Sequence, residues 1–343
     1  MKFTRFIGTA NRDPVYRAAL RERAVRKMDL RPAQGNLALD FTIDDQPLAL
    51  PMSPVVRDLV DLAAMVYVAD ELSHRASATD GWTRTFDAVI PVRSPAVWRR
   101  AGPQLHEVLR FLSGDHYRFQ WTATRTVSAL RNHRATVPDG FDTVCLFSGG
   151  ADSLVGAYEL LEGGRQVLLV GHQADGITAS TQDRVMRFFK RRFEDRVAFI
   201  QARVARSPRA APEFDLGAKV ETTHRPRSFL FLALAIAAAA AADVEQIVIP
   251  ENGLIALNPP LNVSRVGTLS TRTAHPRFIA GFAAWVRALR AFRGQLWNPF
   301  LYLNKTEVVR RAPRPLRPVL RQTLSCSHLG RSRWTGFRGH HCG

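Results

Sequence analysis

The chain has 343 residues, which is enough for two domains of ordinary size. Hydrophobic residues make up 46% of it, which supports a substantial core and excludes a globally disordered protein. The formal net charge is +18, and such a charge favours a polyanionic partner such as nucleic acid, a nucleotide or an acidic protein. The basic residues are mostly Arg and are spread along the chain, so compositional bias can explain the charge as well. A nucleic-acid partner is compatible with this charge but is the less favoured of the two interpretations.

Neither disulfides nor membrane segments are predicted. Three cysteines, Cys145, Cys326 and Cys342, are an odd and sparse set that fits a reducing compartment. Residues 1–14 lack the apolar segment of a signal peptide. The longest apolar run, residues 229–242, is shorter than the roughly 20 residues of a membrane span. We therefore expect a cytoplasmic protein without a membrane partner.

Residues 1–138 lack regular alternation of strands and helices and predict an N-terminal α+β domain of unknown role. Residues 53–72 predict a helix, because Ser53 can cap it and apolar residues recur at helical spacing. The other predicted elements are a helix at 96–112 and strands at 86–92 and 117–124. We interpret the Ser-His pair at 73–74 and the Asp-His pair at 115–116 as surface or turn residues.

A turn cluster at 136–140 precedes a second domain, residues 139–309. Short apolar strands alternate there with helices, which is the pattern of a doubly wound, parallel α/β sheet. The predicted strands are 143–147, 166–170, 197–204 and 246–249, and the predicted helices are 152–161, 180–193, 227–242 and 276–292. Residues 310–343 form a basic, Pro-rich segment that we expect to be irregular.

The first strand of this domain runs through a tight loop into a helix. Gly149 and Gly150 allow the backbone to turn sharply and to approach a ligand closely. The helix then directs free N–H groups and its positive dipole end at the loop, which makes an anion site. Ser148 and Ser153 add hydroxyl donors, and Asp152 can cap the helix, orient a serine or help to hold Mg²⁺.

Residues 148–153, Ser-Gly-Gly-Ala-Asp-Ser, resemble the Ser-Gly-Gly-x-Asp-Ser signature of the PP-loop ATP pyrophosphatases. Walker and dinucleotide-binding patterns are both absent. The resemblance implies that ATP and Mg²⁺ bind here, that a substrate oxygen attacks the α-phosphate and that pyrophosphate leaves. It implies catalytic roles for Asp152, Ser148 and Ser153. The implied nucleotide-binding residues are Phe147, Ser148, Gly149, Gly150, Ala151, Asp152, Ser153, Leu154, Arg227 and Lys305.

Three later segments resemble one branch of that family, the 7-cyano-7-deazaguanine synthases (QueC-like proteins). They are residues 225–235, with Ser228 in place of the usual Asn, residues 298–309, and residues 324–327. The resemblance is closer to the QueC-like proteins of antiphage defence systems (Qat type), which share segments like 251–261 and 270–276. It covers roughly residues 140–343 and implies a ligase or synthase that adenylylates a deazaguanine-type carboxylate for attack by ammonia or an amine.

Two departures concern the acceptor. The Tyr-Pro-Asp-Cys-Arg segment that follows the fourth strand in the biosynthetic enzymes is absent, and residues 171–175 read Gly-His-Gln-Ala-Asp in place of Gly-Gln-x-His. We therefore expect a changed substrate pocket, and we hypothesise that the acceptor is an amine on a protein or peptide, such as an operon partner.

Several conspicuous residues keep two interpretations. His172 and Asp175 follow the second strand, where a ligand contact and turn chemistry are equally good explanations. Arg225 and Arg227 lie at a helix start, which an anionic ligand or simple exposure would explain. Arg265, Arg272 and His275 belong to or follow a predicted long loop, residues 253–274, which favours substrate contact. Cys145 is predicted to be buried in its strand.

Cys326 and Cys342 are predicted to be two ligands of an incomplete zinc site. A structural zinc takes four ligands, and the family pattern continues as Cys-Gly-x-Cys-x-x-Cys, whereas this sequence ends at Cys342-Gly343. The spacing of His328, His340 and His341 matches no pattern that would complete the site. We interpret the chain as cut short within its zinc motif and expect the region from Arg310 to be poorly ordered.

Two alternative functions stay open. A tRNA-modifying PP-loop enzyme, of the thiolation or lysidine type, fits the basic charge, although the cysteine-containing C-terminal segment does not favour it. A nucleotide-binding subunit without catalysis is the other alternative, and the intact Asp152 and loop serines weigh against it.

Overall fold

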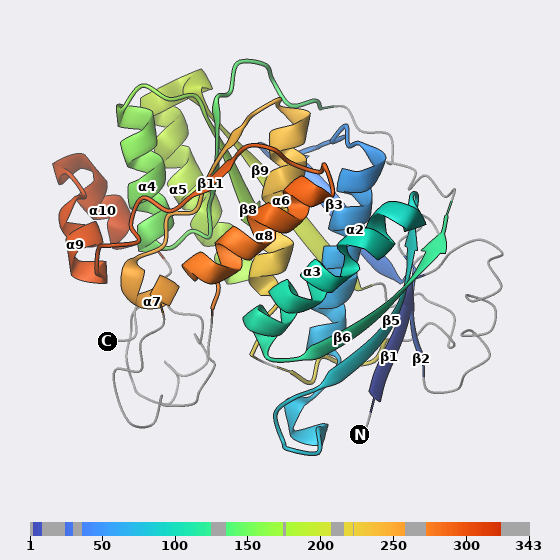
Figure 1. Cartoon of the computed structure of the whole chain (residues 1–343). Helices are drawn as coiled ribbons and strands as arrows, with labels where there is room; N and C mark the ends of the chain where they lie inside the picture. Colours follow the sequence, from blue (N-terminus) through green and yellow to red (C-terminus); the bar gives the residue numbers. More distant parts are fainter. Residues whose placement is uncertain are drawn as a thin grey trace.

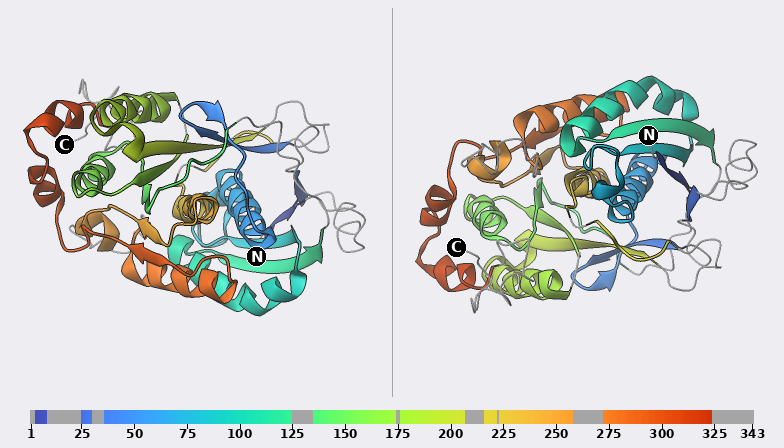
Figure 2. Two further views of the ribbon diagram at one scale, coloured as in Figure 1. Left: turned by 90° about the horizontal axis from the view of Figure 1, so that it is seen from above. Right: turned by 90° about the horizontal axis from the view of Figure 1, so that it is seen from below.

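The computed structural model describes residues 3–8, 25–29, 36–124, 135–173, 176–206, 216–221, 223–257 and 272–323. These residues form an α/β structure in which the strands make two sheets, with helices packed on them and between them (Figure 1, Figure 2). The strand order is β11-β10-β7-β8-β9-β3-β4 in the larger sheet and β2-β1-β5-β6 in the smaller one. Among the described helices, none has the length and apolar character needed to cross a bilayer.

Five neighbouring strands of the larger sheet are parallel. They are β7 (Thr143–Leu146), β8 (Val167–His172), β9 (Val197–Arg206), β10 (Gln246–Val248) and β11 (Gln295–Trp297). The chain moves outward from β7 to β9 and then returns to the other side of β7 to form β10 and β11. The direction of winding therefore reverses between β7 and β10, and ligands of open α/β sheets bind in the crevice at such a point.

Helices cover both faces of this sheet. One face carries α4 (Ala151–Glu162) and α5 (Gly176–Phe193), and the other carries α6 (Arg227–Ala241) and α8 (Pro276–Ala288) (Figure 2). The Ala-rich α6 packs on β7, β8 and β10 and also against α2 (Pro54–Glu71), so small side chains suit its crowded position. Short helices complete this part: α7 (Gly253–Leu257), α9 (Lys305–Arg310) and α10 (Arg317–Leu320).

The smaller sheet is parallel throughout. It consists of β1 (Phe3–Gly8), β2 (Val25–Met28), β5 (Thr85–Val92) and β6 (His116–Ala123), and α3 (Pro95–Ser113) joins β5 to β6. The described strands and α-helices of this part run β1-β2-β3-β4-α2-β5-α3-β6, so they contain one parallel strand–helix–strand unit, β5-α3-β6, but no regular alternation. Two further strands from it, β3 (Leu37–Ile43) and β4 (Gln46–Pro47), belong to the larger sheet, where β3 pairs antiparallel with β9. One apolar core continues from α2 and β5 to α6 and α8.

The C-terminal part is more ordered than predicted as far as Thr323. After α9, a 3₁₀ helix at Arg314–Leu316 leads into α10. Leu316 and Val319 are buried in the same apolar cluster as residues of α4, so the expectation of a poorly ordered region is wrong for residues 310–323. Pro residues stand in the first turns of both short helices, where the missing N–H has no helical partner to lose.

Asp115 lies in the turn between α3 and β6, which is one of the two places expected for it, and it is buried. Its carboxylate lies 2.9 Å from a guanidinium nitrogen of Arg75 and 2.7 Å from one of Arg84. Arg84 also pairs with Asp70 of α2. Ser73, at the neighbouring turn, is buried as well, whereas His74 is exposed and caps the next 3₁₀ helix. These four charged groups are buried as ion pairs, each carboxylate facing both guanidinium groups, although Asp70 Oδ2 has no hydrogen-bond partner among the described residues.

Candidate functional site

The loop after β7 presents two hydroxyl groups at the start of α4. Gly149 adopts a left-handed backbone with φ of +83°, and Gly150 is the N-cap of α4. The Oγ atoms of Ser148 and Ser153 lie 3.3 Å apart. Ser148 Oγ accepts from the Gly150 N–H at 3.3 Å, and the Ser153 hydroxyl donates to the Gly150 carbonyl at 2.9 Å. The loop therefore combines polar hydrogens with the positive end of a helix, as an anion site requires.

The Asp152 side chain is held on both carboxylate oxygens. Lys305 Nζ donates to Oδ1 at 2.9 Å, and Asn252 Nδ2 donates to Oδ2 at 2.7 Å. Asp152 is buried, while the Lys305 side chain is 41% exposed, so the lysine side chain is accessible to solvent. Lys305 begins α9, whose N-cap Asn304 forms a reciprocal capping box with Glu307. The structure thus brings together residues from three segments that sequence analysis had treated separately.

Sequence analysis missed Asn252 as a site residue. Its backbone lies just beyond β10, at the same sheet edge as the loop after β7. Two signals were available: an Asn at a strand's carboxyl end, and its place in the shared segment 251–261. A side chain at Gly253 would collide with the carbonyl oxygen of Leu301. This glycine therefore lets the segment after β10 press against the segment that leads to Lys305.

Glu251 is the second carboxyl group at this edge. Its backbone N–H donates to Asn298 Oδ1 at 3.3 Å, and its carbonyl accepts from Asn298 Nδ2 at 2.8 Å. Burial raises the pKa of Glu251 to about 8, the negative charge of Asp152 adds to the rise, and Lys305 opposes it. At neutral pH the Glu251 carboxyl is therefore mostly protonated, and it can donate a hydrogen bond.

Arg227 lies beside His172 on the α6 side of the sheet. Its guanidinium carbon stands 4.9 Å from the ring centre of Phe231, and the His172 ring lies between Phe231 and Tyr67, at 5.8 and 5.4 Å. Burial lowers the pKa of His172 to about 3, and the positive charges of Arg227 and His224 contribute. His172 is therefore neutral at physiological pH, and among the described residues neither ring nitrogen has a hydrogen-bond partner.

Of the other candidate residues from the sequence, some are packed against the protein interior and the rest lie outside the described residues. Arg225 is buried and stacks over Trp82 at 4.1 Å, so the explanation by simple exposure is wrong. Arg272 donates to the Phe111 carbonyl at 2.8 Å, and His275 caps α8, so both pack against or beside α3. Cys145 is fully buried, as predicted. Residues 253–257 form α7 instead of a loop. Outside the described residues lie Asp175, Arg265, Cys326, His328, His340, His341 and Cys342.

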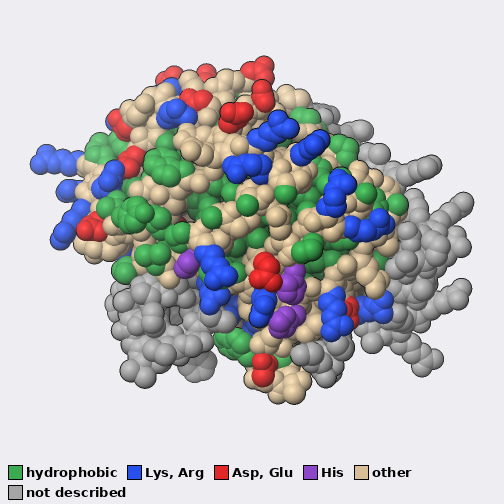
Figure 3. Space-filling model, viewed as in Figure 1, with side chains coloured by type: hydrophobic (Ala, Val, Ile, Leu, Met, Phe, Trp, Pro, Cys, Tyr) green, Lys and Arg blue, Asp and Glu red, His purple; other side chains and the backbone are tan. Residues whose placement is uncertain are grey.

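Basic side chains do not form one continuous patch on the face drawn in Figure 3, where they alternate with acidic and apolar ones among the coloured residues. Exposed arginines do gather around α9 and α10: Arg310, Arg311, Arg314, Arg317 and Arg321. Within the described part of the chain, no group of three or more His, Cys, Asp or Glu side chains is placed to hold a metal ion.

Comparison with known proteins adds no assignment. No family model and no curated protein matches the chain. Among solved structures, a ketoreductase domain from the bacillaene assembly line aligns with 92% of this chain and 85% of its own, at 10% identity and a TM-score of 0.28. A TM-score of that size establishes neither a shared fold nor a shared activity.

Proposed function

We propose that this chain is an ATP-dependent ligase or synthase with a doubly wound PP-loop fold, which converts ATP to AMP and pyrophosphate while activating a carboxylate. The observation that carries the proposal is the joining of the Ser148–Ser153 hydroxyl pair, at the N-terminus of α4, to the Lys305–Asp152 ion pair at the switch point between β7 and β10. Anion-binding donors, a cation and a fixed carboxylate meet there at one edge of the sheet.

In this proposal the loop N–H groups and the two hydroxyls hold the β- and γ-phosphates. The carboxylate oxygen of the substrate attacks the α-phosphorus, the bond from that phosphorus to the bridging oxygen breaks, and pyrophosphate leaves with the electron pair. Lys305 stabilises the charge that develops on the leaving group. An amine then attacks the acyl-adenylate and releases AMP.

Magnesium fits the chemistry of the donor set only in part. Asp152 is the carboxylate that would contact a phosphate-bound Mg²⁺, but Lys305 and Asn252 already donate to its two oxygens. In the nucleotide complex, Lys305 would turn toward phosphate and free one oxygen for the metal, while Asn252 keeps the other oxygen in place. The ion would neutralise phosphate charge.

The acceptor belongs to the same proposal. The resemblance to QueC-like proteins supports a deazaguanine-type carboxylate as the molecule that is activated. The altered segments at 171–175 and after β10 support an amine acceptor larger than ammonia, on a protein or peptide. A role in antiphage defence and a zinc site at Cys326 and Cys342 rest on that resemblance alone.

The test is mass spectrometry of the products after incubation with ATP, Mg²⁺ and 7-carboxy-7-deazaguanine, with and without amine acceptors. AMP and pyrophosphate are the expected products, and they should be absent with Asp152→Ala. Formation of ADP and phosphate overturns the PP-loop assignment. Efficient release of the free nitrile, with no protein adduct when operon partners are present, overturns the protein acceptor and leaves adenylylation standing.

A tRNA-modifying activity is the second candidate, and the exposed arginines around α9 and α10 favour it. Transfer RNA added to the same reaction would then increase AMP formation and change in mass. Tight ATP binding without turnover under all of these conditions would instead indicate a non-catalytic nucleotide-binding subunit.

A further inference from the structure

Two glutamine side chains connect β9 to the base of the loop that we propose to bind phosphate. Gln182 of α5 donates from Nε2 to the carbonyl oxygen of Phe147 at 3.2 Å. Gln201 of β9 donates from Nε2 to Gln182 Oε1 at 2.9 Å. The amide orientations follow from the partners: the Phe147 carbonyl can only accept, so the Gln182 nitrogen faces it, and the Gln182 oxygen then faces the Gln201 nitrogen.

The surrounding backbone leaves room for this chain of hydrogen bonds. Gln182 is fully buried. A Cβ atom at Gly171 of β8 would lie 2.7 Å from the Phe147 oxygen and 2.8 Å from Gln182 Nε2, so only glycine at that position leaves space for the hydrogen bond. On the other side, a Cβ at Gly149 would lie 3.2 Å from Gln182 Cγ. Gln182 thus lies against the loop at two positions, the Phe147 carbonyl and Gly149.

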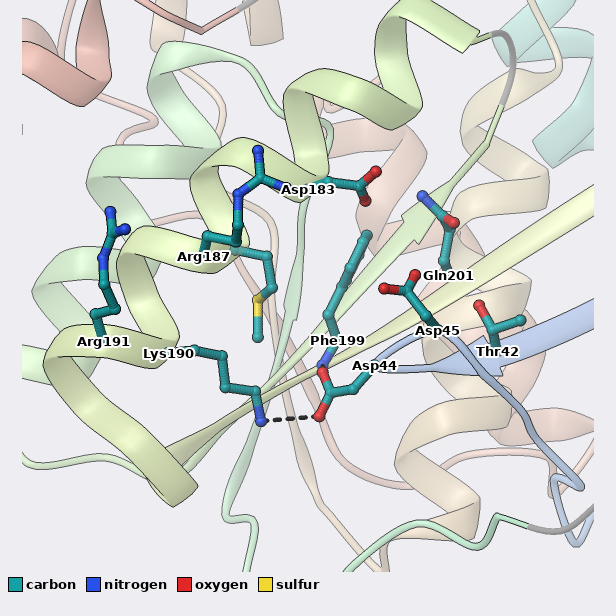
Figure 4. A pocket seen from close by; sticks show the side chains of 10 residues that line it. Thr42, Asp44, Asp45, Asp183, Arg187, Lys190, Arg191, Phe199 and Gln201 are labelled. Atoms are coloured by element: carbon teal, nitrogen blue, oxygen red, sulfur yellow. Dashed lines mark hydrogen bonds and ion pairs between the residues drawn. The ribbon is translucent and has the colours of Figure 1, made fainter.

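The outer end of the chain of hydrogen bonds lies in a cleft of about 440 Å³ between α5 and the β3–β4 turn. Figure 4 shows Gln201 there, near Asp45 and Asp183. Phe199 also lines the cleft, and its ring contacts the Phe147 ring at a centroid distance of 5.6 Å. Gln201 therefore keeps access to solvent, whereas Gln182 has none.

We propose that Gln182, held by Gln201, is a positioning residue for phosphate binding. The peptide between Phe147 and Ser148 is planar and trans, so a hydrogen bond that fixes the Phe147 carbonyl also fixes the direction of the Ser148 N–H. That N–H is the first of the loop, in which Ser148 Oγ accepts from the Gly150 N–H. The inference rests on the proposed function, because it assumes that this loop binds phosphate.

The experiment measures the dissociation constants of ATP and of inorganic pyrophosphate, with Mg²⁺, by calorimetry on the full chain. Gln182→Met removes the donor at similar size, and we expect binding about tenfold weaker at every pH. Gln182→Glu can donate to Phe147 only when protonated. It should bind nearly as the wild type does at about pH 5.5 and lose about tenfold by about pH 8.5.

Gln295→Glu, at an exposed position of β11, is the charge-matched control and should bind like the wild type across the same range. Gln201→Met should weaken binding by a smaller factor, about threefold, because Gln182 keeps its own bond to Phe147. It also serves as the second variant if Gln182→Glu fails to fold.

The outcomes distinguish failure of the positioning role of Gln182 from failure of the proposed function. Wild-type affinity in both Gln182→Met and Gln201→Met overturns the positioning role and leaves the proposed function intact. A pH-dependent loss in Gln182→Glu with wild-type affinity in Gln182→Met indicates simple charge repulsion and also overturns it. A wild-type chain that binds neither ATP nor pyrophosphate overturns the positioning role together with the proposed function.

Discussion

Lys305 and Asp152 are 153 positions apart in the sequence, yet the lysine Nζ lies 2.9 Å from the aspartate Oδ1. This ion pair connects the start of α9 to the first turn of α4, which also carries Ser153 of the loop that we propose to bind phosphate. In the proposed function, the Lys305 ammonium group is the cation that contacts the triphosphate.

Lys305→Met should lower the rate of AMP formation by about two to three orders of magnitude, because it removes one preorganised charge at the leaving group. Stability should decrease modestly, because the buried Asp152 carboxylate loses its cation and keeps its bond to Asn252. The measurement is AMP release under saturating ATP. Lys190→Met is the matched control, because Lys190 forms a comparable 2.8 Å pair with Asp44 away from the loop, and its rate should stay that of the wild type.

Asp152→Ala and Ser148→Ala should each abolish turnover while the far-ultraviolet circular dichroism and the unfolding midpoint stay close to those of the wild type. In Asp152→Ala, Asn252 and Lys305 both lose their hydrogen-bond partner, so a modest decrease in stability is expected for this variant. Ser180→Ala on α5, an exposed serine, is the control. Full activity in Ser148→Ala would contradict a role for its hydroxyl in phosphate binding.

Gly149→Ala should destabilise the protein more than Gly164→Ala does. Both glycines have a positive φ, +83° and +86°, so both substitutions carry a backbone cost of about 1 kcal/mol. At Gly164 a Cβ meets nothing within 4 Å, whereas at Gly149 it lies 3.2 Å from Gln182 Cγ. Urea unfolding of the two variants isolates the effect of the contact with Gln182. Equal decreases in the free energy of unfolding would show that this contact does not destabilise Gly149→Ala.

Glu251 should make stability fall as the pH rises through the neutral range. Its folded-state pKa is about 8, above the ordinary value of 4.5, so the folded protein holds the proton more tightly than the unfolded chain does. The stabilisation is complete below about pH 4.5 and is lost as the pH approaches 8. Glu251→Gln removes this dependence. The measurement is the difference between wild-type and variant unfolding free energies over that range, and a constant difference would contradict the raised pKa.

Asp115→Ala should be among the most destabilising single substitutions in the chain, by about 3–5 kcal/mol, because it leaves the buried guanidinium groups of Arg75 and Arg84 without their shared partner. Asp87→Ala is the control, since Asp87 pairs at 3.8 Å with an arginine whose side chain is 62% exposed. Denaturant unfolding compares them. A loss below about 1 kcal/mol for Asp115→Ala would show that the cluster is not needed for stability.

Local patterns predicted the elements whose apolar residues repeat clearly, such as α2, α3 and the strands β5 to β9 apart from their exact ends. They also predicted that Ser148, Asp152 and Ser153 share one turn. They failed where the determining contact is distant in sequence: β3 is stabilised by β9, Asp115 by Arg75 and Arg84, and the position of Asn252 by its bond to Asp152. No local pattern encodes such partners, so a short polar or mixed segment gives little warning of its burial.

The pairing of β3 with β9 has a consequence for biosynthesis. β3 leaves the ribosome long before β9, and the antiparallel register from Leu37↔Arg206 to Ile43↔Ile200 can form only after β7, α4, β8 and α5 have been made. Until then the nascent β3 can pair only with the short β4, and β9, once made, has an open edge that another chain can join until β3 pairs with it. A recombinant fragment that begins after residue 135 keeps that open edge permanently, so we expect it to aggregate under conditions in which the intact chain does not.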